Sequence, residues 1–173
     1  MIFILTGPVD SGKTTFLKRV IKELKRQKIK IDGFLSEPLK QNQEKIGYDL
    51  LDLKSRRAVP FIRKSGRQDW QKIGPYFFIP EGLSLAKKII LRGREAEVLV
   101  VDEIGPLELS GQGLWDALEK VIFQRAQKSL LVLRRGILEE FLNLVGKIRI
   151  KIFDIEEGDI FPRLIKEIKK SQS

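Results

Sequence analysis

The segment Gly7–Thr14 constrains the fold of this chain more than any other part of the sequence. It matches the pattern G-x-x-x-x-G-K-[ST], whose glycines let successive backbone N–H groups turn toward phosphate oxygens. The apolar run Ile2–Leu5 precedes this segment, and a pattern with helical period follows it from Thr14. The sequence therefore predicts a buried strand, a phosphate-binding loop and a helix in succession.

The loop has the parts that a nucleoside triphosphate and its Mg²⁺ require. The N-terminus of the following helix adds the positive end of its dipole. Lys13 is expected to reach the β- and γ-phosphates, and the Thr14 hydroxyl is expected to bind Mg²⁺. A turn that used glycine for geometry alone would not explain these two residues. The predicted nucleotide-binding residues are Gly7, Pro8, Val9, Asp10, Ser11, Gly12, Lys13, Thr14 and Thr15.

A second apolar run, Val98–Val101, leads directly into two acidic residues, Asp102 and Glu103. Ligands bind at the carboxyl ends of the strands of a parallel sheet. There Asp102 suits the anchoring of Mg²⁺ and Glu103 suits the polarisation of an attacking water. The alternative is that both acids cap a strand and face solvent.

The absence of histidine and cysteine restricts the chemistry. Any general base must be a carboxylate, a lysine or a water held by other groups, which favours Glu103. The apolar run Leu130–Leu133 delivers Arg134 and Arg135 to the same edge of the sheet, where one of them is a candidate for neutralising charge on the transferring phosphate. The alternative is that both arginines are solvated or contact acidic side chains. The predicted catalytic residues are Lys13, Glu103, Arg134 and Arg135.

Strands and helices alternate along most of the chain, which predicts an α/β fold with a parallel, RecA-like P-loop sheet flanked by helices on both faces. Residues 36–79 interrupt this alternation. Lys45–Leu53 and Ala58–Ile62 indicate two strands of an antiparallel hairpin inserted into the core. The remaining apolar patterns predict a strand at Ile29–Leu35, a helix at Pro80–Arg92 with Gly93 as its C-cap, and an edge strand with Ile148, Ile150 and Ile152. We expect a single P-loop domain over residues 1–173.

The motifs resemble those of the THEP1-type nucleoside-triphosphatases, and their order and spacing cover most of the chain. The resemblance rests on the segments Leu5–Thr15, Ile31–Glu37, Ile46–Asp49, Ile73–Tyr76 and Asp102–Leu109. It implies a Mg²⁺-dependent hydrolase that removes the γ-phosphate of ATP, GTP and other triphosphates. The family's loop lysine and threonine correspond to Lys13 and Thr14, and its acidic pair corresponds to Asp102 and Glu103.

The chain departs from the family pattern at two places. Asp10, within Val9-Asp10-Ser11, puts a negative charge near the phosphates, where it is expected to weaken affinity or to orient a water or partner. Pro106 stands where many members carry lysine, which implies a slower enzyme or a transfer of that lysine's role to Arg134 or Arg135.

Two other functions remain open from the sequence. One is a P-loop kinase that phosphorylates a small acceptor, with a lid made of Arg56, Arg57, Arg63 and Arg67. The other is a nucleotide-switched module that binds nucleic acid. The net charge of +10 favours polyanions, and bases could stack on Trp70, Tyr76, Phe77 and Phe78. A solvated Lys/Glu-rich surface is the favoured explanation of the charge, and Phe77 and Phe78 are expected to be core residues of a short strand.

No apolar run approaches the roughly 18 residues that a membrane-spanning helix needs, so we expect no membrane association and a cytoplasmic location. The sequence does not determine the oligomeric state, and a monomer is the favoured expectation.

Overall fold

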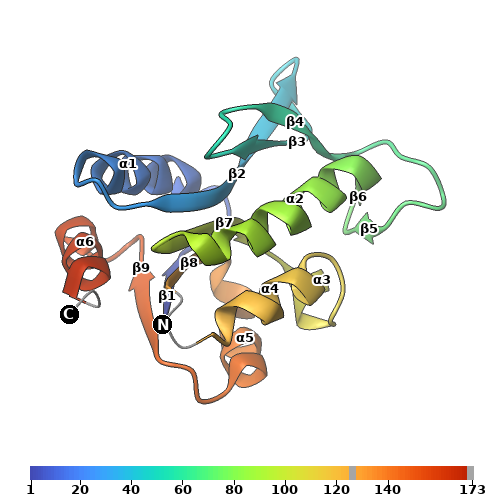
Figure 1. The fold of residues 1–173 in the computed structure, drawn as a ribbon. Helices are drawn as coiled ribbons and strands as arrows, with labels where there is room; N and C mark the ends of the chain where they lie inside the picture. The colour runs from blue at the N-terminus through green and yellow to red at the C-terminus, as the bar shows by residue number, and fades with distance from the viewer. Residues whose placement is uncertain (125–127, 171–173) are drawn as a thin grey trace.

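The computed structural model describes residues 1–124 and 128–170. They form one nine-stranded sheet, ordered β5-β6-β4-β3-β2-β7-β8-β1-β9, with helices on both faces (Figure 1). The strands are β1 Ile2–Thr6, β2 Ile31–Gln41, β3 Glu44–Asp52, β4 Ala58–Arg63, β5 Lys72–Ile73, β6 Tyr76–Phe78, β7 Val98–Ile104, β8 Lys128–Leu133 and β9 Ile150–Asp154. The helices are α1 Lys13–Arg26, α2 Pro80–Arg92, α3 Pro106–Leu109, α4 Trp115–Ile122, α5 Leu138–Val145 and α6 Ile160–Lys170, with short 3-10 turns η1 Gly93–Glu95 and η2 Arg135–Ile137. The predicted α/β fold is confirmed.

The strands β2, β7, β8, β1 and β9 run parallel to one another. Strand β8 lies between β1, which ends at the phosphate-binding loop, and β7, which carries the two acids. Because parallel strands end at one edge of a sheet, this order brings the loop, the acidic pair and the two arginines together. Strand β9 lies at the outer edge, as predicted, although it begins at Ile150.

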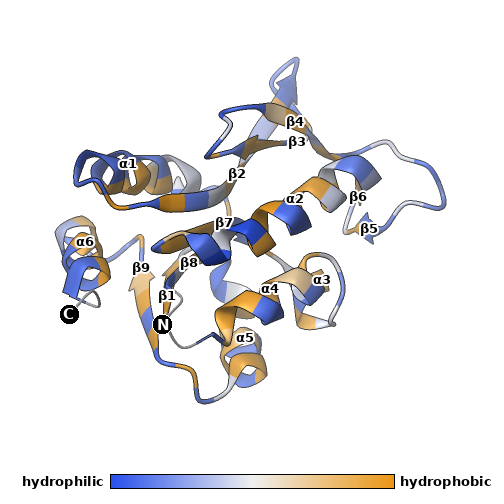
Figure 2. Cartoon of the chain, viewed as in Figure 1, coloured by the Kyte–Doolittle hydropathy of each residue, from blue (hydrophilic) through white to orange (hydrophobic). Residues whose placement is uncertain are grey.

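The alternation of side chains along the strands builds a hydrophobic core on each face of the sheet. Phe3 and Leu5 of β1 pack with α1 and α6, whereas Ile2 and Ile4 of the same strand pack with α2, α4 and α5. Figure 2 shows the apolar residues following the strands and the inward sides of these helices. Both faces are covered, which explains why the core strands read as continuous apolar runs.

The predicted hairpin is present as β3 and β4. It is part of a larger antiparallel extension, in which the second half of β2 is followed across the sheet by β3, β4, β6 and β5. Strand β2 continues six residues beyond the predicted end at Leu35, to Gln41, and pairs with β3 along most of that length. The two central residues of the β2–β3 turn, Asn42 and Gln43, both have positive φ values, of 49° and 66°. A turn of this kind matches the twist of a tight hairpin. The sheet is therefore mixed, and β2 belongs to both parts.

An ion-pair cluster joins this extension to the parallel core. The Arg92 guanidinium, at the end of α2, donates to Asp32 of β2 at 2.7 and 2.6 Å and to Asp52 of β3 at 2.8 Å. Both aspartates are only 7% exposed. The neighbouring Gly33 has φ 128°, and a Cβ there would lie 1.9 Å from the carbonyl oxygen of Val100. Strand β2 therefore packs against β7 at a distance that only glycine permits.

Gly93 is the C-cap of α2, as predicted. Its conformation is right-handed, with φ −59°, and it begins η1. A Cβ at Gly93 would lie 2.5 Å from Leu99 Cδ1, so packing rather than conformation favours glycine there. The short helix α3 was not predicted, although Pro106 occupies its first turn, where proline is favoured.

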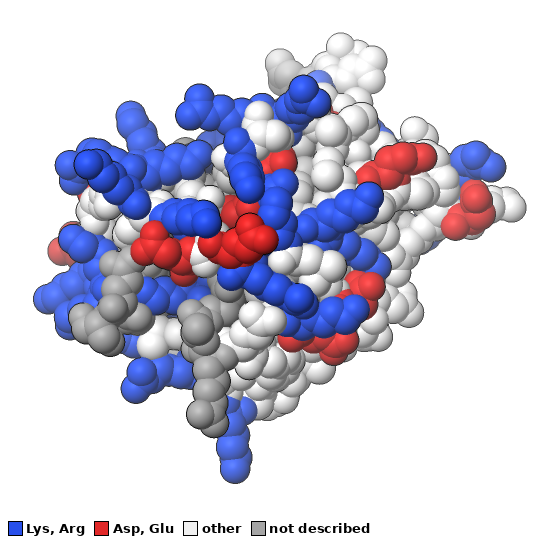
Figure 3. All heavy atoms as spheres, viewed as in Figure 1, with Lys and Arg blue, Asp and Glu red and all other residues white. Residues whose placement is uncertain are grey.

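The basic side chains visible in Figure 3 are densest over the side of the molecule where α1 and α6 lie, with acidic side chains among them. Within residues 1–124 and 128–170, none of the helices has the length and apolar character needed to cross a bilayer.

The Arg92 cluster yields a prediction for stability. Arg92→Ala leaves two buried carboxylates side by side without their cation, so we expect a loss of about 3 kcal/mol in the free energy of unfolding. Arg94→Ala, which removes an exposed arginine two residues away, is the matched control and should cost less than about 0.5 kcal/mol. Urea denaturation of both variants measures the difference. Equal stability of the two would show that the cluster does not anchor the extension.

Candidate active site

The loop between β1 and α1 is shaped to receive an anion. Gly12 precedes the helix with φ 86°, a left-handed conformation that favours glycine. In the described part of the chain, no side chain caps the N-terminus of α1, and the buried Ser11 hydroxyl has no hydrogen-bond partner. The first N–H groups of a helix carry partial positive charge and need acceptors. The loop therefore collects donors that a phosphate group would satisfy.

The Lys13 side chain folds back over this loop. Its ammonium group donates to the Pro8 carbonyl oxygen at 2.5 Å and to the Gly7 carbonyl oxygen at 3.3 Å, and the residue is 6% exposed. Burial lowers the pKa of Lys13, while the carboxylates of Glu103 and Asp102 act in the opposite direction. A cation held at this point is positioned to meet the phosphate oxygens that enter the loop.

Asp102 connects β7 to the start of α1. Its Oδ2 accepts a hydrogen bond from the Thr14 hydroxyl at 3.0 Å and a longer one from the Ser36 N–H at 3.4 Å. The side chain is 1% exposed. Burial raises the pKa of Asp102 to about 7, and the nearby charge of Glu103 adds to the effect. Burial therefore disfavours the charged form of this carboxyl group.

These two residues fit Mg²⁺. The hydroxyl of Thr14 and the carboxylate of Asp102 are hard oxygen ligands, and a divalent cation would compensate the buried charge. Within the described ranges, no group of three or more acidic, histidine or cysteine side chains is arranged for a metal. Mg²⁺ commonly binds through one or two protein oxygens together with phosphate oxygens and water, so the pair suits a metal that arrives with a nucleotide.

Glu103 follows Asp102 directly in β7. Strand β7 extends beyond both acids to Ile104. The register with β8 skips one residue: Asp102 pairs with Val132, and Ile104 pairs with Leu133. This irregularity leaves Glu103 without a partner in the ladder and partly exposed, at the wall of a pocket.

The two arginines after β8 have different partners. Arg134 donates from Nε to the Glu103 carboxylate at 2.5 Å and lines the same pocket. Arg135 instead contacts Asp154 at 2.7 to 3.0 Å and Glu156 at 2.5 Å, near the end of β9. The structure thus brings Arg134, but not Arg135, next to Glu103.

The antiparallel extension contacts the phosphate-binding loop and the helix that follows it. Lys45 of β3 forms an ion pair of 2.7 Å with Asp10 in the loop, and Glu37 of β2 forms one of 2.7 Å with Lys18 of α1. The pairing with Lys45 lowers the pKa of Asp10. The negative charge that the sequence places near the phosphates is therefore partly compensated by a residue from the extension. Val9, beside Asp10, is 59% exposed.

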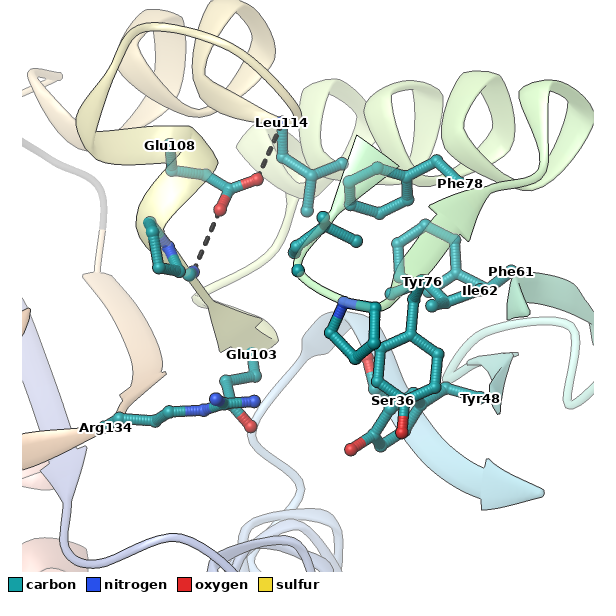
Figure 4. A pocket seen from close by; sticks show the side chains of 15 residues that line it. Ser36, Tyr48, Phe61, Ile62, Tyr76, Phe78, Glu103, Glu108, Leu114 and Arg134 are labelled. Carbon is teal, nitrogen blue, oxygen red and sulfur yellow. Dashed lines mark hydrogen bonds and ion pairs between the residues drawn. The ribbon is translucent and has the colours of Figure 1, made fainter. Parts of the chain in front are cut away.

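Figure 4 shows a pocket of about 170 Å³ beside Glu103 and Arg134. Sequence reasoning assigned no role to Ser36, Tyr48 or Glu108, which also line it. The buried Glu108 carboxylate accepts from the Gly105 N–H at 2.9 Å and the Leu114 N–H at 3.0 Å. Its position three residues after Gly105 is the sequence signal that could have identified it as a capping residue.

Three of the residues proposed for the alternative functions have other roles in the fold. Phe78 is 3% exposed and belongs to the core, and Tyr76 packs edge-on against Tyr48 with ring centroids 6.0 Å apart. Arg63, proposed for a lid, donates to Asp49 at 2.6 Å and to the Tyr48 carbonyl at 2.7 Å. Binding of nucleic acid stays a prediction.

Comparisons with a family model and with individual proteins point to the same family. The model of a family described as NTPase matches residues 2–165. The nucleoside-triphosphatase THEP1 of Thermococcus kodakarensis is 30% identical, over 97% of this chain and 96% of its own length. That of Thermofilum pendens is 29% identical, over 96% and 94%.

Two solved structures share the fold. A human cancer-related nucleoside triphosphatase superimposes with a TM-score of 0.76 at 23% identity, over 99% of this chain and 98% of its own. THEP1 from Aquifex aeolicus also gives 0.76, at 19% identity, over 98% and 99%.

The raised pKa of Asp102 predicts how stability depends on pH. Because the folded state holds this proton more tightly than the unfolded state, whose pKa is near 3.8, the group destabilises the fold as pH rises from about 4 to about 7. Asp102→Asn removes the charge, so we expect the variant to be more stable above pH 7 without Mg²⁺, by up to about 4 kcal/mol.

Thermal unfolding at pH 8 and pH 4 measures this gain, which should vanish at the lower pH. Asp69→Asn, at an exposed site, is the control and should show no such dependence. A variant less stable than the parent at pH 8 would mean that the hydrogen bonds of Asp102 outweigh its desolvation.

Proposed function

This chain belongs to the THEP1-type NTPase family and is a nucleoside-triphosphatase, and we propose that it removes the γ-phosphate of ATP, GTP and other nucleoside triphosphates with Mg²⁺. One observation carries this proposal. The Thr14 hydroxyl, at the start of α1, lies 3.0 Å from the buried Asp102 carboxylate, and Glu103 is the next residue of the same strand. A metal-binding pair and a candidate base thus stand next to a phosphate-binding loop.

In this proposal the loop binds and orients the triphosphate. The N–H groups between Gly7 and Thr14 and the dipole of α1 hold the phosphate oxygens. Lys13 exchanges its contacts with the Pro8 and Gly7 carbonyl oxygens for contacts with the β- and γ-phosphates. The exchange keeps a buried cation paired at all times, which limits its desolvation cost.

Thr14 and Asp102 are the residues that would hold Mg²⁺. When bound there with the nucleotide, the ion supplies positive charge against the phosphates and against the buried carboxylate. Asp102 must be ionised to hold the metal. Because its pKa is about 7, metal binding should strengthen as the pH rises above about 7.

Glu103 acts on the water that attacks the γ-phosphorus. Its carboxylate accepts a hydrogen bond from the water, orients it and takes its proton. Arg134 stands beside it and balances charge that develops on the γ-phosphate. Arg135 stabilises the end of β9 through Asp154 and Glu156. Arg134 thereby supplies the cation that the family resemblance implies at the position of Pro106.

The first test of this proposal is Glu103→Gln. The amide keeps the size of the side chain but removes the charge that orients and deprotonates water, so turnover should fall about 10²-fold or more. Affinity for Mg²⁺ and ATP should change little. Phosphate release under saturating ATP and calorimetry of a non-hydrolysable analogue measure the two quantities. Parental turnover in the variant would exclude Glu103 as the base.

The second test separates the two arginines. Arg134→Ala should reduce turnover about 10³-fold, in the range observed when an arginine that stabilises transferring phosphate is removed. Arg135→Ala should keep turnover nearly normal and change the stability of the fold little, because its ion pairs are exposed. Steady-state kinetics of the pair decide the assignment. The opposite order, with Arg135 essential, would require a different arrangement of the site.

A further inference from the structure

The pocket beside Glu103 has a lining that hydrolysis does not require. None of the loop residues 7–15 is among the described residues that line it. A water needs two to four polar partners to be held in place, whereas most of this lining is apolar. We propose that the pocket binds a second substrate, a neutral alcohol built on a single flat ring, whose hydroxyl accepts the γ-phosphoryl group in place of water. The inference rests on the proposed function, because it uses the same γ-phosphate and the same base.

The shape of the pocket suits a flat ring. Two pairs of aromatic side chains form much of its wall: Tyr48 with Tyr76, at a centroid distance of 6.0 Å, and Phe61 with Phe78, at 5.2 Å. Figure 4 shows these rings on one side of the cavity and Glu103 with Arg134 on the other. Aromatic walls with a few polar groups at one end are typical of sites for small ring-shaped ligands.

The size of the pocket limits the ligand to one ring. Its volume is about 170 Å³. For comparison, an apolar cavity of about 150 Å³ in another protein holds benzene. A nucleoside or a fused ring system with a sugar would need more space.

The charges of the lining exclude a phosphorylated acceptor. Arg134 is the one cation among the described lining residues, and it already pairs with Glu103. The second carboxylate, Glu108, is engaged by the N–H groups of Gly105 and Leu114. A phosphate or carboxylate on the acceptor would be buried without a counter-charge, at a cost of several kcal/mol. The ligand is therefore neutral, with its hydroxyl toward Glu103.

The transfer balances without any further reactant. The hydroxyl oxygen of the ring alcohol forms a bond to the γ-phosphorus, and the bond from that phosphorus to the β–γ bridging oxygen breaks. The hydroxyl proton passes to the Glu103 carboxylate and then to solvent. The nucleoside diphosphate leaves with the bonding electron pair, and the acceptor becomes a phosphate monoester.

The test uses benzyl alcohol and 3-pyridinemethanol as ring alcohols, with radiolabelled γ-phosphate in ATP and Mg²⁺. Toluene, which has no hydroxyl, and glycerol, which has no ring, are the controls. We expect the ring alcohols to bind with a dissociation constant near 1 mM, as for ligands of this size, and to divert label from inorganic phosphate into a phosphate ester. Toluene should bind without forming product, and glycerol should do neither.

Ile73→Trp fills the pocket from its partly exposed edge, and Ile152→Trp, at an exposed site on β9, is the matched control. Filling the pocket should reduce ester formation at least about 10-fold, while phosphate release to water and the KM for ATP stay within about twofold. Tyr76→Ala offers a second variant should the tryptophan disturb folding, and it should weaken binding of both ring alcohols about 10-fold.

The outcomes separate the inference from the function on which it rests. Normal phosphate release without binding of either ring alcohol, or without ester, would overturn the acceptor site and leave the triphosphatase intact. A raised KM for ATP in Ile73→Trp would also overturn it, because the pocket would then hold part of the nucleotide. Absence of any phosphate release would contradict the proposed function itself.

Discussion

The active edge of this protein depends on one buried carboxylate. Asp102 lies almost fully buried at the end of β7, in contact with the Thr14 hydroxyl, so an anion is held where the sheet is otherwise apolar. Such a group costs free energy unless a cation joins it, and burial raises its pKa to about 7. The same contact joins β7 to the phosphate-binding helix α1. In the proposed function, the feature that weakens the isolated fold is also the one that would receive a metal and its triphosphate, as is common for functional sites.

The order of the parallel strands assembles the site at one edge of the sheet. With β8 between β1 and β7, the loop, the acids and Arg134 meet at a single edge. Along β7, Asp102 contacts Thr14 at the start of α1, and Glu103, at the irregularity in the ladder, lines the pocket. The antiparallel extension completes the arrangement: Lys45 reaches Asp10 in the loop, and the extension supplies aromatic walls beyond Glu103. The extension is anchored far from the chemistry, by Arg92 and its two aspartates.

The sequence predicted those features that lie within short contiguous segments of the chain. The loop, Asp102 and Glu103 follow apolar strands directly, so period and position were enough to place them at one edge. It failed where the outcome depends on distant partners. Arg134 and Arg135 are equivalent in sequence, and only the acids at the end of β9 distinguish them. The β2–β3 turn is formed by Asn42 and Gln43 and contains no glycine. The sequence therefore offered no turn signal at this point, and the end of β2 was predicted too early. The pocket is assembled from separate segments, and Glu108 resembles a surface acid until its backbone partners are known.

The central claim is that a cation arriving with the nucleotide relieves the buried charge of Asp102. Calorimetry of the Mg²⁺ complex of a non-hydrolysable ATP analogue, at pH 7 in two buffers of different ionisation enthalpy, measures the protons released on binding. A carboxyl group with a pKa of about 7 is half protonated there, so the parent should release about half a proton per site more than Asp102→Asn does. Equal proton release in the parent and the variant would contradict the account.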